Sequence, residues 1–360
     1  MPAAIDASAI PFLTQQVLWA TFGLSALFGF AAQRSHFCTM GAVNDIVNMQ
    51  DWTRMHMWAM AVAIAMLGFA CLSYFGFIQP DKALYATPKV LWLSALTGGL
   101  LFGFGMVLAS GCSNKTLLRI SSGSLKSLVV FVVMGVAAFA TLKGVTAVVR
   151  VNTVDLFSFT APTLSLTIRL VLSGTIAALL LMWALRNPQM RQMNYFLPTM
   201  IIGLAIAGVW FVSGRLGYLQ EHPESLQEAF IATNSGRMES LSFVAPVAYV
   251  IDWLMFFSDK AKVLTLGMVS VFGVILGGFV EAKLSKTFRW EGFGSVEDVA
   301  NHLIGAVLMG AGGVTAMGCT VGQGLSGVST LALGSFIALA GILMGAVFAF
   351  KYQIWRLDRM

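Results

Sequence analysis

The sequence predicts an all-α membrane protein that crosses the bilayer several times, and its composition, span-length apolar segments and lack of a hydrophilic domain carry this prediction. Only 11% of the 360 residues are Asp, Glu, Lys or Arg, whereas 58% are apolar. A typical globular protein contains about 25% charged residues, so most of this chain's surface must face lipid. The composition therefore excludes a soluble enzyme, a nucleic-acid-binding protein and a disulfide-stapled secreted domain.

Apolar segments of membrane-spanning length recur along the chain. A helix needs roughly 20 residues to cross about 30 Å of hydrocarbon. Segments that meet or approach this length are residues 7–33, 55–80, 90–114, 127–149, 156–185, 192–214, 240–258, 263–280 and 299–350, the last long enough for two spans. We expect about nine complete crossings together with re-entrant or broken helices. Lys143 and Arg169 lie near span ends, where we expect their side chains to extend to the membrane surface, with a functional role inside the membrane as the alternative.

Charged residues outside the spans predict the topology. Residues 214–242 contain four Glu and two Arg, which favours the outer face, whereas Lys351, Arg356 and Arg359 favour a cytoplasmic C-terminus. No Lys or Arg precedes Arg34, so the pattern of a cleaved signal peptide is missing. We therefore expect the first apolar segment to remain in the mature protein, and we attribute the net charge of +6 to topology.

An internal repeat divides the chain. Nine of the 27 residues in 99–125 recur 207 positions later in 306–332. The first members of these pairs are Leu101, Gly103, Gly105, Val107, Ala109, Gly111, Cys112, Leu118 and Ser122. We expect one membrane domain over 1–360, with two pseudo-symmetric halves at about 12–150 and 260–350, inverted relative to each other and joined by 151–259.

The two Gly-Cys pairs of the repeat mark expected helix breaks. Gly111-Cys112 is followed by Ser and Asn, and Gly318-Cys319 begins a ten-residue stretch with four glycines. A broken backbone at membrane depth is tolerated only where protein or a water-lined cavity satisfies its polar groups. Paired breaks therefore predict a transport site near the membrane midplane. Glycine-rich turns that connect helices at the surface are the alternative.

The four cysteines differ in their surroundings. They include no Cys-x-x-Cys pair and have no histidine at zinc-finger spacing, so we expect no metal site. Cys71 lies in an apolar stretch and is expected to be a small buried hydrophobic residue. Cys38 follows Arg34 and His36 at the end of the first span, where either a functional thiol or a packed thiol fits the pattern.

Three segments resemble the signature segments of the YeeE/YedE family of sulfur-transport membrane proteins. They are Arg34–Gly41, Gly103–Cys112 and Met317–Gly327, and the resemblance extends from the first span to about residue 350. It implies uptake of thiosulfate across a bacterial inner membrane by an hourglass-like fold whose loops enter from both sides. It further implies that Cys38, Cys112 and Cys319 line a narrow path and relay the anion by S–H contacts. No catalytic activity and no cofactor are implied, and a small soluble sulfur-carrier protein is an expected partner.

Two departures from the family pattern lie near this path. Gln323 stands where many members have His, and Ser113-Asn-Lys115 replaces a smaller and less charged run. Lys115 and Arg119 follow Cys112 by three and seven residues, so they share a helical face. These two cations either guide the anion or belong to a solvated face.

The chemistry of thiosulfate suits neutral thiols and glycine-flanked backbone. The dianion has one soft sulfur end, and transport requires binding that is weak enough for release. Thiols donate only weak hydrogen bonds, while Gly111 and Gly318 expose backbone N–H groups for the oxygens. The alternatives are a transporter of another sulfur or selenium species, a membrane thiol oxidoreductase and a soft-metal transporter that uses some of the 20 Met residues.

Overall fold

The computed structural model describes residues 9–162, 164–223 and 226–358. Its α-helices are α1 (Ile10–Arg34), α2 (Thr39–Asn44), α3 (Thr53–Tyr74), α4 (Trp92–Leu108), α5 (Ser113–Ser121), α6 (Leu125–Lys143), α7 (Val145–Asn152), α8 (Leu166–Leu185), α9 (Met193–Phe211), α10 (Val244–Met255), α11 (Leu266–Leu284), α12 (Val296–Thr315) and α13 (Leu333–Leu357). Single π-helical segments are η2 (Asp45–Met49), η6 (Val212–Leu216) and η7 (Gly322–Gly327), and short 3-10 turns are η3 (Pro80–Lys82), η4 (Val154–Leu156) and η5 (Pro188–Arg191). The chain is therefore mostly helical, as its composition predicts.

Within the described ranges, seven helical segments are long and apolar enough to cross a membrane. They are Thr53–Tyr74, Trp92–Ser121, Leu125–Lys143, Leu166–Leu185, Met193–Leu216, Leu266–Leu284 and Leu333–Arg356. Two other helices, α1 with 25 residues and α12 with 20, have sufficient length but are less apolar. The expected number of nine crossings therefore stays a prediction, as does the pseudo-symmetry of the two halves.

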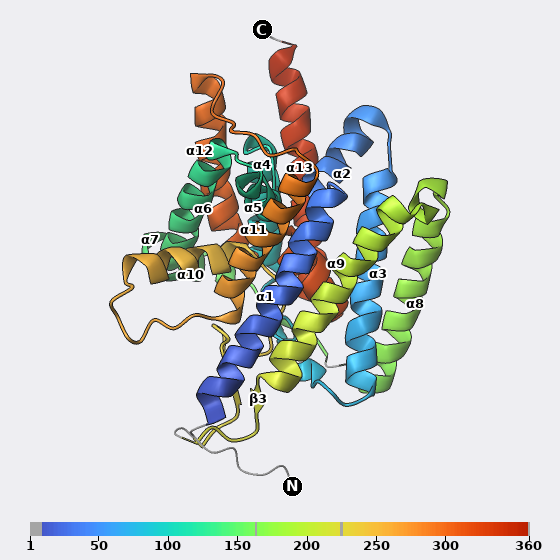
Figure 1. The fold of residues 1–360 in the computed structure, drawn as a ribbon, viewed down its shortest axis with the longest axis vertical. Coiled ribbons are helices and arrows are strands. Elements are labelled where there is room, and N and C mark those ends of the chain that lie inside the picture. Colours follow the sequence, from blue (N-terminus) through green and yellow to red (C-terminus); the bar gives the residue numbers. More distant parts are fainter. Residues whose placement is uncertain (1–8, 163, 224–225, 359–360) are drawn as a thin grey trace.

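One expected span is wrong. Residues 240–258 contain only the 12-residue helix α10, which is too short to cross the hydrocarbon layer. Figure 1 shows α10 lying across the upright helices rather than alongside them. Asp252 sits inside this helix and pairs with Lys262, so the polar residue is accommodated at an end of the bundle by a nearby cation.

Glycines allow the backbones of the central helices to touch. α4 lies between α12 and α13, and a side chain at Gly103 would overlap the carbonyl oxygen of Ile342 on α13. On the other side of α4, a Cβ at Gly105 would lie 2.7 Å from the carbonyl oxygen of Gly305 on α12. Close backbone packing of this kind is typical of membrane helices. It fixes the helices from which two of the helix breaks start.

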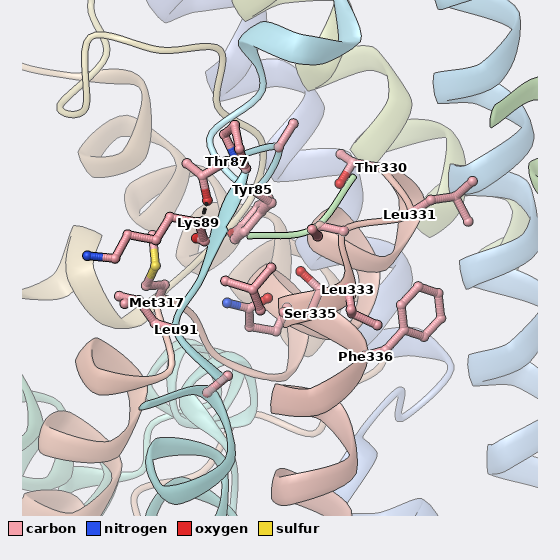
Figure 2. Close-up of a pocket in the computed structure, with 18 of the residues that line it drawn as sticks. Tyr85, Thr87, Lys89, Leu91, Met317, Thr330, Leu331, Leu333, Ser335 and Phe336 are labelled. Carbon is pink, nitrogen blue, oxygen red and sulfur yellow. Dashed lines mark hydrogen bonds between the residues drawn. The ribbon is translucent and has the colours of Figure 1, made fainter. Parts of the chain in front are cut away.

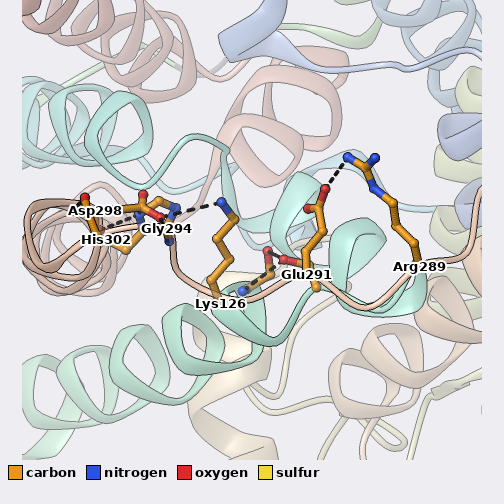
Figure 3. Close-up of polar contacts among 9 residues, drawn as sticks. Lys126, Arg289, Glu291, Gly294, Asp298 and His302 are labelled. Atoms are coloured by element: carbon orange, nitrogen blue, oxygen red, sulfur yellow. Dashed lines mark hydrogen bonds and ion pairs between the residues drawn. The ribbon is translucent and has the colours of Figure 1, made fainter.

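The two ends of the bundle are built differently. At the end where the chain begins, strands β1 (Lys89–Val90) and β2 (Phe159–Thr160) pair with each other, and so do β3 (Tyr218–Leu219) and β4 (Ala229–Phe230). At the opposite end, polar contacts hold the loop between α11 and α12 (Figure 3). Asp298 lies 3.6 Å from Lys126 Nζ and 2.9 Å from His302 Nδ1. These contacts tie the start of α12 to the start of α6.

Candidate functional site

The same backbone turn ends three helices. α1, α4 and α12 are each followed by a residue in the left-handed region, namely His36 (φ 52°), Ser110 (φ 56°) and Met317 (φ 58°). The next N–H groups, of Phe37, Gly111 and Gly318, donate to carbonyl oxygens five residues earlier at 2.9, 2.8 and 2.8 Å. This is the Schellman arrangement of a helix C-terminus. In all three turns the residue that follows is a cysteine: Cys38, Cys112 or Cys319.

Each cysteine then begins a new helix. The Cys38 sulfur accepts the N–H of Gly41, and the Cys319 sulfur accepts the N–H of Gly322, both at 3.4 Å. The sulfur of Cys112 also approaches the backbone N–H of Lys115, but it makes no capping hydrogen bond to α5. The first N–H groups of a helix have no partner within that helix, so the sulfurs of Cys38 and Cys319 take the capping role that a side-chain oxygen usually has. In both cases this contact does not use the S–H hydrogen.

The three turns bring the thiols into one region. The thiols of Cys38 and Cys112 lie close enough to act as donor and acceptor to one another. The hydroxyl of Thr320, the residue after Cys319, faces the thiol of Cys112. All three cysteines are buried, with exposed fractions of 8% for Cys38, 1% for Cys112 and 0% for Cys319. The cysteines named by the sequence motifs therefore converge, although they lie up to 281 positions apart in the chain, from 38 to 319.

Cations surround the Cys38 side of this region. Lys115 and Arg119 on α5 both lie close enough to Cys38 to act on it electrostatically, and both are half-buried. Arg54 on α3 also approaches, because a Cβ at Gly41 would lie only 2.5 Å from its Nη1 atom. The shared helical face expected for Lys115 and Arg119 is thus turned toward the first thiol rather than away from it.

The glycines before Cys112 and Cys319 are covered by side chains from the following turn. A Cβ at Gly111 would lie 3.2 Å from the side chain of Lys115. A Cβ at Gly318 would lie 3.1 Å from Cγ of Gln323, which is itself 3% exposed and donates to the carbonyl oxygen of Ala316. The two candidate glycines therefore bring a cation and an amide close to their respective thiols.

Several buried polar atoms around the thiols and the neighbouring cavity have no hydrogen-bond partner within the described part of the chain. They are Ser113 Oγ, Asn114 Oδ1, Thr320 Oγ1, Gln323 Oε1 and Ser335 Oγ. Such atoms are rare in folded proteins because leaving a buried polar group unpaired costs about 1–3 kcal/mol. Their concentration around three thiols is typical of a site that receives a polar guest.

A cavity of about 370 Å³ opens beside the third thiol. Figure 2 shows Tyr85, Met317, Thr330 and Ser335 around it. Gln323 also lines the cavity, and its side chain packs against Gly318 next to Cys319. The cavity is therefore lined by Met317 and Gln323, which lie before and after the Gly318-Cys319 pair in the chain.

The fourth cysteine corrects the expectation from sequence. Cys71 is exposed on α3, not buried, because the apolar residues around it face lipid on that side of the helix. It takes no part in the convergence of the other three. Within the described residues, no three His, Cys, Asp or Glu side chains gather as metal ligands would.

Sequence reasoning missed two residues of this region. The sequence could have indicated Thr320, because a threonine follows both Cys38 and Cys319. Tyr85 carried no such signal: it lies in the loop before α4, and its hydroxyl would be 3.1 Å from a Cβ at Gly322. Its place next to the Cys319 turn follows only from the packing of distant segments.

Comparisons with known proteins identify relatives and a family for the chain. Over 332 residues the chain is 27% identical to the thiosulfate transporter TsuA of Escherichia coli K12, which covers 89% of this chain and 90% of that protein. It is 26% identical over 350 residues to the thiosulfate transporter TsuA of Spirochaeta thermophila, covering 91% and 97%. A shorter stretch of 98 residues is 37% identical to the probable transporter YedE of Escherichia coli K12, covering 27% and 22%. Residues 34–348 match the family described as sulphur transport, and the three converging cysteines all lie within that match. The chain therefore belongs to the sulphur transport (YeeE/YedE) family of membrane proteins.

Proposed function

We propose that this protein takes up thiosulfate across a bacterial inner membrane and that the thiols of Cys38, Cys112 and Cys319 relay the anion. The observation that carries the proposal is the contact between the thiols of Cys38 and Cys112, with Thr320, the neighbour of Cys319 in the third helix break, beside them. Two relatives that cover about 90% of the chain bear the name thiosulfate transporter.

The relay uses the soft end of thiosulfate. The sulfurs of Cys38 and Cys319 already accept a backbone N–H, so their S–H hydrogens are left to donate to the terminal sulfur of the anion. The Cys112 thiol, which pairs with Cys38, exchanges that contact for the anion. S–H donors are weak, and weak binding at successive positions allows an anion to leave as readily as it arrives. No covalent bond to a cysteine forms in this scheme, so the protein acts as a transporter and not as an enzyme.

The polar atoms around the thiols serve the hard end of the anion. Among the described residues the hydroxyl of Ser113 has no partner and that of Thr320 faces only the Cys112 thiol, so both are able to donate to the three oxygens. Lys115 and Arg119 then attract the dianion toward Cys38. The direction of movement is therefore from the cavity beside Cys319, past Cys112, to the cationic side at Cys38.

Charge distribution supports an orientation with the C-terminus in the cytoplasm. The end of the bundle where the chain finishes carries the links between α1 and α3, α8 and α9, and α11 and α12 (Figure 1). Basic residues in and beside these links are Arg34, Arg54, Arg186, Arg191, Lys283, Lys286 and Arg289. Loops rich in Lys and Arg stay in the cytoplasm. A small soluble sulfur-carrier protein would receive the anion on this side.

The deciding experiment measures uptake of labelled thiosulfate into vesicles that contain only this protein. Unlabelled thiosulfate should compete fully, whereas sulfide, sulfite, tetrathionate and selenite should compete weakly. If selenite or another sulfur species competes more strongly than thiosulfate, that species and not thiosulfate is the substrate. Absence of any uptake that depends on the protein would contradict the proposal.

A further inference from the structure

Arg169 departs from the expectation that it extends to the membrane surface. It lies on α8, a peripheral helix in which only Ser173, Ala177 and Ala184 are buried. The Arg169 side chain is nevertheless only 12% exposed. It turns inward and lines the cavity of about 370 Å³ that ends beside Cys319. Burial of a cationic side chain on a helix that is otherwise mostly exposed indicates a specific role for that side chain.

The hydrogen bonds of Arg169 are incomplete. Its Nη2 atom donates to Asp81 Oδ1 at 2.8 Å and approaches the carbonyl oxygen of Leu164 at 3.5 Å. Its Nη1 atom is buried and has no partner among the residues that the structure describes. A guanidinium carries five N–H donors, so this one keeps donors available for a further acceptor. Asp81 lies on the 3-10 turn η3 with its side chain 75% exposed, so its carboxylate is able to move into solvent.

The wall of the cavity opposite Arg169 also has unused polar atoms. Gln323 Oε1 and Ser335 Oγ line the cavity and have no partner. Lys89 lines the cavity as well, but Figure 2 shows its ammonium group pointing away from Ser335. Arg169 is therefore the cation that is positioned to meet a guest in this cavity.

We propose that this cavity is a capture site for a tetrahedral oxyanion, in which Arg169 binds the oxygen end and Asp81 holds Arg169 while the site is empty. Arginine presents its N–H groups in a fork that matches two oxygens of such an anion. A dianion attracts the guanidinium more strongly than one carboxylate does, so it displaces Asp81 into solvent. The hydroxyl of Ser335 is available as a further donor.

This capture site rests on the proposed function for the identity of the transported anion, and it assigns the two ends of that anion to different groups. Arg169 takes the oxygens first, and Cys319, which lies in the chain between the cavity-lining residues Met317 and Gln323, then takes the terminal sulfur. Sulfate has the same oxygens and no terminal sulfur. Sulfate should therefore bind at Arg169 without being passed to the thiols.

The test combines three variants in vesicle uptake of labelled thiosulfate, with sulfate as competitor. Arg169→Gln should raise the half-saturating thiosulfate concentration about 10-fold to 100-fold, since a lost hydrogen bond to a charged group has an effect of that order. Asp81→Asn should lower that concentration several-fold, because the competing carboxylate is gone. Asp81→Asn should have no further effect in the Arg169→Gln background, since the carboxylate acts only through Arg169.

Arg150→Gln is the matched control. It removes a comparable ion pair, in which Arg150 Nε lies 3.1 Å from Asp155 Oδ2, and Arg150 does not line this cavity. Sulfate should inhibit uptake by the wild type and by Arg150→Gln, and this inhibition should be lost in Arg169→Gln. Equal shifts for Arg169→Gln and Arg150→Gln, or undiminished inhibition by sulfate in Arg169→Gln, would overturn the capture site.

Binding of labelled sulfate to the purified protein separates this inference from the proposed function. The capture site requires sulfate binding that falls in Arg169→Gln and rises in Asp81→Asn, whether or not thiosulfate is the transported anion. Loss of uptake in the wild type would contradict the proposed function alone. If Arg169→Gln does not fold, the exposed Asp81→Asn variant decides the matter, and unchanged sulfate affinity there contradicts the inference.

Discussion

The breaks at Cys112 and Cys319 share one backbone turn but have different chemical surroundings. Both follow a left-handed residue, Ser110 or Met317, and both are preceded by glycine. The side chain that covers the glycine is a cation at Gly111, where Lys115 lies, and an amide at Gly318, where Gln323 lies. The turn thus fixes where a thiol sits, and a residue three or four positions later sets the charge beside it.

This difference gives the two breaks separate tasks under the proposed function. A neutral surrounding at Cys319 would accept an anion from the cavity without holding it strongly. A cationic surrounding at Cys112 and Cys38 would draw the anion onward. The variants below test whether the shared turn and the differing charge contribute separately.

The largest expected effect is loss of the thiols. Cys112→Ala and Cys319→Ala should each reduce thiosulfate uptake to background, because each removes the only S–H donor of its turn. Growth on thiosulfate as the sole sulfur source, in a strain lacking other uptake systems, gives a second measurement. Cys71→Ala is the control, since Cys71 lies exposed on α3 away from the other thiols. Normal growth of Cys319→Ala would contradict the relay.

A smaller effect should separate the two glycines. A Cβ at Gly318 would meet the backbone nitrogen of Gln323 at 3.2 Å as well as its Cγ at 3.1 Å, whereas a Cβ at Gly111 would meet only the flexible side chain of Lys115. Overpacking of a rigid neighbour costs about 1–3 kcal/mol, so Gly318→Ala should lower stability by about that amount and reduce uptake strongly. Gly111→Ala should lower stability by less. Thermal unfolding of the purified variants measures this difference, and equal losses would show that the two turns are not packed differently.

The sequence predicts the helix breaks at Cys112 and Cys319 because a glycine precedes each cysteine. No glycine precedes Cys38, so the same kind of break is not predicted there. Residue 37 is Phe, and the left-handed residue is His36, yet the N–H of Phe37 closes the same turn on Ala32. The hydrogen bond at the end of α1 holds His36 in the left-handed conformation. Neither His nor Phe at these positions predicts that conformation as a glycine would.

The positions of Arg169 and Cys71 show why other expectations failed. Sequence indicates a charge near a span end or a thiol in an apolar stretch, but it does not indicate which face of the helix meets a neighbour. α8 and the residues just before it contribute one side of a cavity whose other residues lie at 81–95 and 315–336, so the direction of Arg169 depends on segments far away in the chain. The 240–258 segment failed for a simpler reason, because its helix begins only at Val244 and ends at Met255.

Exchange of the covering side chains should produce a several-fold effect. Lys115→Gln should slow uptake several-fold, because it removes one cation from the Cys38 side while leaving the turn intact. Gln323→Lys should place a cation where the anion needs only weak binding, and should lower the maximal rate more than the half-saturating concentration. Lys115→Arg retains the charge and is the control. A Lys115→Gln variant with wild-type uptake would remove Lys115 from the path.

The smallest expected effect concerns strain in the shared turn. A left-handed conformation costs a non-glycine residue about 1–2 kcal/mol, while glycine loses about 0.5–1 kcal/mol more through its flexibility in the unfolded chain. Ser110→Gly and Met317→Gly should therefore raise stability slightly, by less than about 1 kcal/mol each and by similar amounts, since their φ values of 56° and 58° are nearly equal. Thermal unfolding of the purified variants is the measurement.

Alanines that precede these two residues provide matched controls for the strain. Ala109 and Ala316 have φ values of −80° and −78°, where alanine is unstrained. Ala109→Gly and Ala316→Gly should therefore lower stability by about 0.5–1 kcal/mol. If Ser110→Gly and Met317→Gly lower stability as much as these controls do, then the left-handed residues are not strained. The breaks at Cys112 and Cys319 would then share the hydrogen bonds of the turn, but the turn would not strain the left-handed residue in either of them.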